Sequence, residues 1–381
     1  MHRLSLHFGV FFLILSSFPV LQSTGYAAPS DFSEASVDVS LEVKIGQMLM
    51  VGFRGLQVDD QHPVIRDIRE CHLGGVILSD YDTASQKYYR NIESPAQLRE
   101  LTETLQKASA TPLLIAIDHE GGLINRLKES YGFPPTVSHG YLGTLDNLAT
   151  TYHEAGKMAE TLAEIGFNLN LAPVIDLNAN PENPVIAGRE RSFSADADAV
   201  TRHALEFIRA HREQGVYCTM KHFPGHGSSK KDSHLGLVDV TNVWSRVELE
   251  PYRNLIKAEK VDVVMTAHIF NANLDSSYPA TLSHATITGL LRNELNYEGV
   301  VISDDLQMKA ITAHYGFDAA IRKALEAGID ILLITNNSGH YDEAIFRRAF
   351  AVIQKLVETD VISEARIDQS YQRIRKLKSS L

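Results

Sequence analysis

The chain of 381 residues has only two cysteines, Cys71 and Cys218. Small exported folds that depend on several disulfides are therefore excluded, as are zinc sites built from cysteine clusters. Each cysteine lies in or beside an apolar segment. The pair could form one disulfide after export or remain as two buried free thiols, and the sequence leaves both open.

Clusters of basic residues are also missing. The chain has 36 lysines and arginines against 47 aspartates and glutamates, which gives a formal charge of −11 at pH 7. A chain with this balance and no basic run lacks the electrostatic means to capture nucleic acid or an anionic membrane. We expect neither as a partner.

No uninterrupted apolar run reaches the roughly 20 residues that a membrane-spanning helix needs. The longest candidate begins at Phe8 and is interrupted at Ser16 and Pro19. A basic start, a short apolar stretch and small residues up to Ala28 are typical of a secretory signal peptide. We predict that residues 1–27 are removed and that the product is periplasmic or extracellular, without a membrane anchor. An uncleaved anchor is the alternative.

After residue 40, short β-rich segments alternate with longer segments of helical period. The segments with strand character are 47–53, 74–78, 113–117, 168–171, 216–220, 261–266, 300–303 and 329–334. Eight strands with intervening helices over about 300 residues match a (β/α)8 barrel of the TIM type. An open, doubly wound sheet is the alternative, but no strand is followed by a glycine-rich nucleotide turn. We predict a single barrel domain over 40–381, completed by C-terminal helices.

Polar side chains follow most of these strands. They are Asp118, Asp176, Lys221, His222, His268, Asp304 and Asn336. In a barrel the carboxyl ends of all strands meet at one rim, where catalytic residues lie. The sequence therefore predicts a polar pocket at that rim.

The segment 221–234 contains three histidines, an aspartate and lysines on a loop rich in glycine. Asp232 and His234 are separated by one residue, so the carboxylate could accept a hydrogen bond from the imidazole and fix its tautomer. Such a histidine could protonate a leaving group and then deprotonate water. Two alternatives are a solvated loop without chemistry and a metal site that uses His222, His226, Asp232 and His234.

Asp304 follows four residues of strand character, and a carboxylate held there could attack an anomeric carbon. The alternative is a helix cap by Asp304 or Asp305, of which Asp305 lies nearer the following helix.

The order K-H-F-P-G-H-G, four residues, then D-S-H, from Lys221 to His234, resembles the signature of glycoside hydrolase family 3, in its β-N-acetylhexosaminidase branch. Further blocks match the family in order. They are D-H-E-G-G at 118–122 with Arg126, then 168–177, 191–193, 265–268 with 279–283, and 303–306. The resemblance covers roughly residues 40–378.

The resemblance implies that Asp304 is the nucleophile and that His234, paired with Asp232, is the acid/base. The substrate contacts that it implies are Asp118, Arg126, Arg191, Lys221 and His222. It implies no metal and no organic cofactor. Leu123 stands where the family usually has arginine, which leaves the preferred leaving group open.

The activity that follows is a retaining exo-β-N-acetylglucosaminidase. Its substrate would be a carbohydrate that contains N-acetylglucosamine, from peptidoglycan fragments or chitooligosaccharides, and a monomer is favoured. The alternative functions are a β-glycosidase of different specificity, a glycoside phosphorylase, a non-catalytic carbohydrate-binding homologue and a metal-dependent barrel hydrolase.

Overall fold

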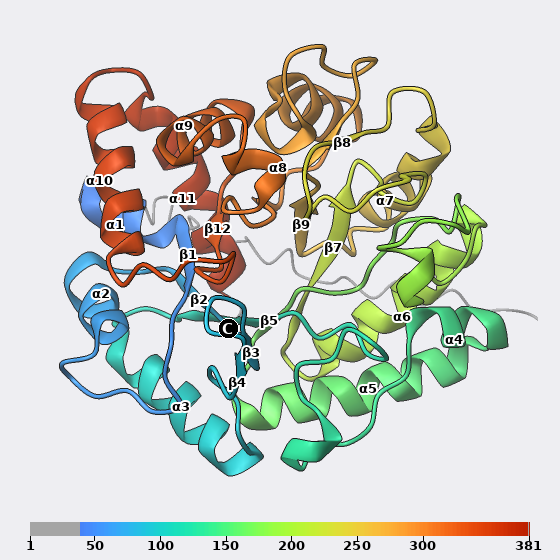
Figure 1. Ribbon diagram of the computed structural model, residues 1–381, viewed down its shortest axis with the longest axis horizontal. Coiled ribbons are helices and arrows are strands. Elements are labelled where there is room, and N and C mark those ends of the chain that lie inside the picture. The colour runs from blue at the N-terminus through green and yellow to red at the C-terminus, as the bar shows by residue number, and fades with distance from the viewer. Residues whose placement is uncertain (1–38, 380) are drawn as a thin grey trace, which may run out of the picture. The chain divides into compact units, whose positions relative to one another are not determined.

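The computed structural model describes residues 39–379 and 381, so the predicted signal peptide lies outside the described residues. Eight parallel strands form one sheet in the order β11-β9-β7-β6-β5-β2-β1-β12 (Figure 1). Their bounds are β1 Leu49–Gly52, β2 Gly75–Leu78, β5 Leu114–Ile117, β6 Leu169–Asn170, β7 Tyr217–Phe223, β9 Val263–Thr266, β11 Val300–Ile302 and β12 Leu332–Ile334.

The two ends of this sheet meet. Ile302 at the end of β11 forms a parallel bridge with Ile331, and the Ser303 N–H donates to the Ile331 carbonyl at 3.0 Å. The sheet thus closes into a barrel, the predicted (β/α)8 architecture is confirmed, and the open doubly wound sheet is wrong. Parallel strands of a barrel are covered on both faces, which explains why their sequences are continuous apolar runs.

Helices surround the barrel (Figure 1). The α-helices are α1 Leu41–Gln47, α2 Pro63–Cys71, α3 Pro95–Ala108, α4 His139–Leu145, α5 Leu148–Ile165, α6 Ala197–Glu213, α7 Glu250–Lys257, α8 Lys309–Thr312, α9 Phe317–Ala327, α10 Ile345–Glu358 and α11 Glu364–Lys378. A π-helical segment spans Ala285–Glu294, and 3-10 turns span Glu129–Tyr131, Ala187–Arg189, Arg246–Leu249 and Ala280–Leu282. No helix in the described part of the chain is long and apolar enough to cross a membrane.

Helix α3 illustrates how local sequence sets these elements. The Ser94 hydroxyl caps the helix by accepting from the Gln97 N–H, and Pro95 occupies the first turn, where its missing N–H is harmless. Leu98, Leu101 and Leu105 recur at helical spacing and are buried. The amphipathic pattern therefore fixes which face packs on the barrel.

Strand β6 is only two residues long, and an asparagine side chain extends its pairing with β5. The Asn168 Oδ1 accepts from the Ile115 N–H at 2.8 Å, and its Nδ2 donates to the Leu113 carbonyl at 2.8 Å. The amide thus replaces a backbone partner at the start of the strand.

Both cysteines are free thiols in this fold, so the predicted alternative of a disulfide between Cys71 and Cys218 is not formed.

Two pairs of short strands lie beyond the carboxyl ends of the barrel strands. Strands β3 Tyr81–Asp82 and β4 Lys87–Tyr88 form an antiparallel hairpin after β2. Strands β8 Val238–Asp239 and β10 Ile269–Phe270 pair in parallel beyond β7 and β9. These extensions lie on the side of the barrel where the polar residues follow the strands.

Candidate active site

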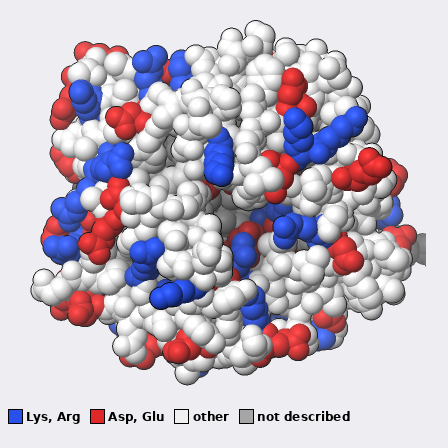
Figure 2. All heavy atoms as spheres, viewed as in Figure 1, with Lys and Arg blue, Asp and Glu red and all other residues white. Residues whose placement is uncertain are grey.

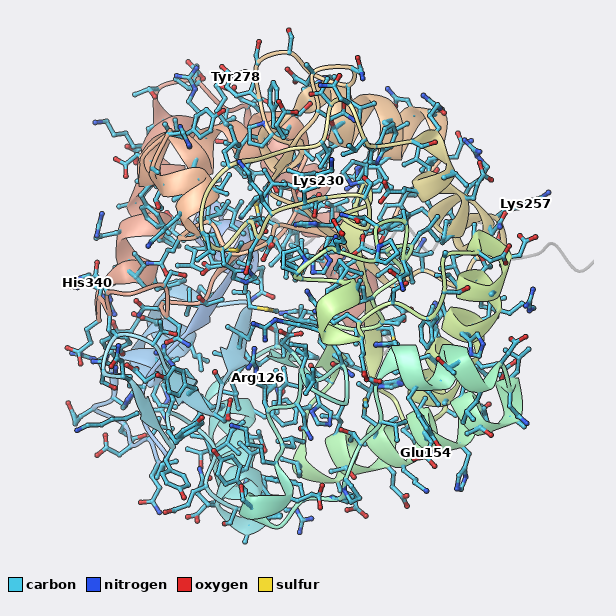
Figure 3. The ribbon with its side chains drawn as sticks, turned by 45° about the vertical axis from the view of Figure 1, so that its right-hand side comes forward. Arg126, Glu154, Lys230, Lys257, Tyr278 and His340 are labelled. Carbon is cyan, nitrogen blue, oxygen red and sulfur yellow. The ribbon has the colours of Figure 1, made fainter. Side chains whose placement is uncertain are left out.

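The carboxyl ends of the strands bring the predicted site residues to one rim. Asp118 follows β5, Lys221 and His222 lie in β7, and Asp304 follows β11. Figure 2 shows a hollow near the middle of this face, with both acidic and basic side chains in its wall. In Figure 3 Arg126 lies near the middle of the molecule, whereas Glu154 and Lys257 lie at its edge.

A network of ion pairs forms one wall of the site. The Lys221 Nζ lies 2.6 Å from Asp118 Oδ1 and 2.6 Å from Glu120 Oε1. Arg191 donates to both oxygens of Glu120 at 2.7 Å, and Arg126 lies 3.4 Å from Asp118. Burial alone would raise the pKa of Glu120, but the two cations beside it hold that pKa well below its ordinary value. Glu120 is therefore an anion that neutralises Arg191 and Lys221 in a buried setting.

Asp176, on the segment that follows β6, orients His222. Its Oδ2 lies 2.6 Å from His222 Nδ1, and its Oδ1 accepts the backbone N–H of His226 at 2.7 Å. On the other side of the ring, Arg191 Nη2 lies 3.1 Å from His222 Nε2. Both ring nitrogens of His222 are therefore engaged by protein groups, Nδ1 by a carboxylate and Nε2 by a guanidinium.

Asp176 was predicted to lie in the polar pocket without a role of its own, and Glu120 was not predicted as a site residue. Both are buried carboxylates, and each positions groups that were predicted to contact substrate. Signals were available, because Glu120 lies within the D-H-E-G-G block and Asp176 follows a strand. Neither signal distinguishes a substrate contact from a carboxylate that supports one, since that depends on which side chain faces the hollow.

Asp304 is half-buried after β11, and its Oδ1 accepts the Asp305 N–H at 2.8 Å. Burial would raise its pKa, but His268, His222 and His234 together lower it from its ordinary value. Asp304 is therefore ionised at neutral pH, which a nucleophile requires. The three histidines lie within electrostatic range of this carboxylate although they come from three different segments.

The helix-cap reading of the two aspartates is wrong. Helix α8 begins at Lys309, and its cap residue is Met308, which makes no side-chain capping bond. Asp305 instead accepts from the Thr335 N–H at 3.0 Å and from the Ser338 hydroxyl at 2.6 Å. Its carboxylate ties the end of β11 to the loop after β12, a long-range contact that local sequence does not reveal.

Asp232 and His234 form a hydrogen-bonded pair on the segment between β7 and β8. The His234 Nδ1 lies 2.6 Å from Asp232 Oδ1, which also accepts the His234 N–H at 2.8 Å. Burial would raise the pKa of Asp232, but its bonds with His234 lower it. The His234 side chain is 63% exposed, so a ligand or water can reach its Nε2. The pair has the arrangement of a histidine oriented by a carboxylate for proton transfer.

The base of this segment is packed tightly. A Cβ at Gly227 would lie 1.8 Å from the Leu177 carbonyl oxygen, so only glycine fits there. The His226 ring contacts the Ser229 hydroxyl at 2.7 Å and the Ser233 hydroxyl at 3.3 Å, and burial lowers its pKa to about 4. His226 is thus a neutral, structural residue of the loop base.

The predicted alternative of a metal site is not supported by these contacts. His222 is engaged by Asp176 and Arg191, and His226 by two serines. Within residues 39–379 and 381, no group of three or more His, Cys, Asp or Glu side chains is arranged to hold a metal ion.

The buried Glu248 carboxylate contacts the start of the segment that carries Asp232 and His234. Its titration should affect how the stability of the fold depends on pH. Glu248 is 1% exposed, and its Oε2 accepts the Gly227 N–H at 2.9 Å. Burial raises its pKa to about 7, against the opposing effects of Ser228 and Gly227. The folded protein thus retains a proton that the unfolded chain loses near pH 4.5. Folding should become less stable as the pH rises from 4.5 to 7, by on the order of 2–3 kcal/mol.

Glu248→Gln should remove this loss, because the amide keeps an acceptor for Gly227 and does not titrate. The measurement is the free energy of unfolding in urea at pH 5 and pH 8. The variant should show a smaller decline than the wild type. Glu250→Gln, two positions further on and half-buried, is the control. Equal declines in wild type and Glu248→Gln would contradict the prediction.

Comparisons with known proteins agree on one family. The model described as the glycosyl hydrolase family 3 N-terminal domain matches residues 40–377. Beta-hexosaminidase A of Pseudoalteromonas piscicida is 34% identical, over 91% of this chain and 62% of its own length. The chain therefore spans less than two thirds of that relative. A beta-hexosaminidase of Tolumonas auensis is 36% identical over 76% of this chain and 83% of its own length.

Solved structures give the same result. A family 3 beta-N-acetylglucosaminidase from Paenibacillus superposes with a TM-score of 0.81 at 38% identity, over 90% of this chain and 62% of that one. A beta-N-acetylhexosaminidase from Beutenbergia cavernae gives a TM-score of 0.78 at 29% identity, over 90% and 99%. From the match to the family model over most of its length and from these relatives, the chain belongs to glycosyl hydrolase family 3.

Proposed function

We propose that the protein is a retaining exo-β-N-acetylglucosaminidase. The observation that carries this proposal is an ionised Asp304 within electrostatic range of His234, which is itself hydrogen-bonded to Asp232. A nucleophile and an oriented acid/base are the two groups that a double-displacement glycosidase needs. The relatives named beta-hexosaminidase and beta-N-acetylglucosaminidase support the choice of sugar.

The residues would act in two steps. In the first, Asp304 attacks the anomeric carbon while His234 protonates the departing oxygen, which leaves a covalent glycosyl-Asp304 ester. In the second, His234 deprotonates water, which attacks the same carbon and releases Asp304. Two inversions give net retention of configuration. Asp232 would orient the His234 ring and stabilise the imidazolium that donates the proton in the first step and re-forms when water is deprotonated in the second.

The terminal sugar would be bound at the wall formed by Asp118, Arg126 and Lys221. Asp118 can accept hydrogen bonds from sugar hydroxyls, and Lys221 and Arg126 can donate to hydroxyl or N-acetyl oxygens. Arg191 and His222 are bound to each other and to buried carboxylates, so they would shape this wall and reach the sugar only at its edges. Natural substrates would be peptidoglycan fragments or chitooligosaccharides.

The direct test uses aryl β-glycosides. Release of nitrophenol from the N-acetylglucosaminide, with the β-anomer as first product and little release from the glucoside, is the expected result. Activity on the glucoside alone would favour a β-glycosidase of different specificity. A product that becomes a sugar phosphate when inorganic phosphate is present would favour a phosphorylase. Binding without turnover of either sugar would favour a non-catalytic homologue.

We also propose that the protein is exported, on the basis of the pattern at residues 1–27. Expressed in a bacterial host, it should be recovered outside the cytoplasm with an intact mass that lacks this segment, because signal peptidase cleaves after small residues. A version that begins after residue 27 should stay in the cytoplasm. Full-length mass in the cytoplasmic fraction would contradict the proposal.

A further inference from the structure

A hairpin at the rim is fixed by charged contacts from both sides. Asp82 accepts from Arg54 at 2.7 and 2.9 Å and from Arg90 at 2.8 Å. Asn337, from the loop after β12, donates to the Tyr81 carbonyl at 2.9 Å. Because contacts from segments far apart in sequence converge on β3, which pairs with β4, the hairpin has a defined position over the barrel.

This hairpin presents two tyrosines to solvent. Tyr88 is 55% exposed and Tyr89 is 52% exposed. The Lys128 ammonium lies 4.3 Å from the centre of the Tyr88 ring, and the Tyr131 ring lies 5.4 Å from that of Tyr89. The two rings are therefore held in place by neighbours while about half of each stays uncovered. We call Tyr88 and Tyr89 the tyrosine lip.

The lip is continuous with the predicted substrate wall. Leu78 of β2 pairs with Ile117 of β5, and Asp80 and Asp118 follow these two residues. Neighbouring strands lie about 5 Å apart, so the segments that carry Asp80 and Asp118 leave the barrel next to each other, with Asp80 buried and Asp118 partly exposed.

Two cations of one segment, Arg126 and Lys128, form ion pairs with these two carboxylates. Lys128 lies 2.6 Å from Asp80, and Arg126 lies 3.4 Å from Asp118. Arg126 and Lys128 are two residues apart, and Figure 3 places Arg126 near the middle of the molecule. A ligand that occupies the wall at Asp118 and Arg126 and extends along this segment would reach the lip next.

Resting on the proposed function, we propose that the tyrosine lip is a subsite for the sugar ring that follows the cleaved one, so that the enzyme prefers oligosaccharides to simple glycosides. Tyrosine offers a large, rigid contact area at little cost in conformational entropy, and its face suits the C–H face of a pyranose. Because an exo-acting enzyme removes the terminal residue, any further ring lies on the leaving-group side. The lip therefore selects the leaving group, the specificity that Leu123 had left open.

The test compares chitotriose with the nitrophenyl N-acetylglucosaminide in wild type, Tyr88→Ala, Tyr89→Ala and the double variant. The ratio of kcat/KM for chitotriose to that for the aryl glycoside should fall about five- to tenfold in the double variant, mainly through KM. Tyr88→Phe with Tyr89→Phe should keep most of the ratio, since the ring faces remain. Tyr141→Ala, which removes a tyrosine that is 51% exposed on α4, is the matched control and should leave the ratio unchanged.

An unchanged ratio in the double variant would overturn the subsite, whatever happens to absolute activity. If the wild type cleaves neither substrate, the proposed function fails and the lip is tested by binding alone. Chitotriose affinity of the wild type is then measured by calorimetry, beside the double variant. A loss of about fivefold or more would support the subsite, and equal affinity would overturn it.

Discussion

Asp304→Ala is expected to lower kcat/KM on the nitrophenyl N-acetylglucosaminide by on the order of 10⁴-fold, because the proposed covalent intermediate forms on this carboxylate. The lowered pKa of Asp304 keeps its carboxylate ionised at neutral pH, the form that attacks. The fold should be unaffected, since the side chain is half-buried and its hydrogen bond with the Asp305 N–H is local. Rates and the thermal midpoint are measured on the same preparation.

Chemical rescue makes this prediction specific to a nucleophile. Removing the carboxylate leaves space on the face of the sugar that it attacked. Azide should enter there, bond to the anomeric carbon and displace nitrophenolate, which gives the α-glycosyl azide and restores part of the rate. Wild-type turnover, or a β-glycosyl azide, would exclude Asp304 as the nucleophile.

His234→Ala is expected to lower kcat/KM on chitobiose by about 10³-fold, because a sugar alkoxide leaves only if it is protonated. A dinitrophenyl leaving group needs little protonation, so the same variant should lose far less of its rate on the dinitrophenyl glycoside. The dependence of the loss on the leaving group, measured across a series of aryl glycosides, identifies the acid. Since the His234 side chain is 63% exposed, the free energy of unfolding should change by less than about 0.5 kcal/mol.

Asp232→Asn separates orientation from proton transfer. The amide is an uncharged partner for the His234 ring, so it no longer fixes the tautomer of that ring. The His234 imidazole itself remains and can still transfer a proton. The kcat/KM of Asp232→Asn on chitobiose should lie between the values of wild type and His234→Ala. Equal losses on good and poor leaving groups in His234→Ala would show that His234 positions the substrate and does not act as the acid.

Several features of the site followed from the sequence because they depend on short spacing or on strand ends. Asp232 and His234 are two residues apart, and the chain itself brings their side chains within 2.6 Å. Asp118, Lys221 and Asp304 each follow or end a strand, and parallel strands in a barrel must deliver such residues to one rim. These inferences needed only the alternation of strands and helices.

Other features depended on which side chains meet across the barrel. Asp305 has the position of a helix cap, yet it binds Thr335 and Ser338 about 30 positions away. Gly225 and Gly227 belong to a loop rich in glycine, and a Cβ at either would collide with Glu248 or with the Leu177 backbone. Local sequence carries no signal for such contacts, because they arise only when two distant segments are packed together.

By itself the sequence determined the barrel, the family and the candidate groups for chemistry, since apolar periodicity and ordered motifs are local properties. Only the tertiary structure decided how those groups are supported. Glu120 neutralises two buried cations, and Asp176 orients the His222 ring. The tyrosine lip likewise appears only when the hairpin after β2 is placed beside the segment that carries Lys128. Long-range electrostatics and packing act between segments whose proximity exists only in the folded chain.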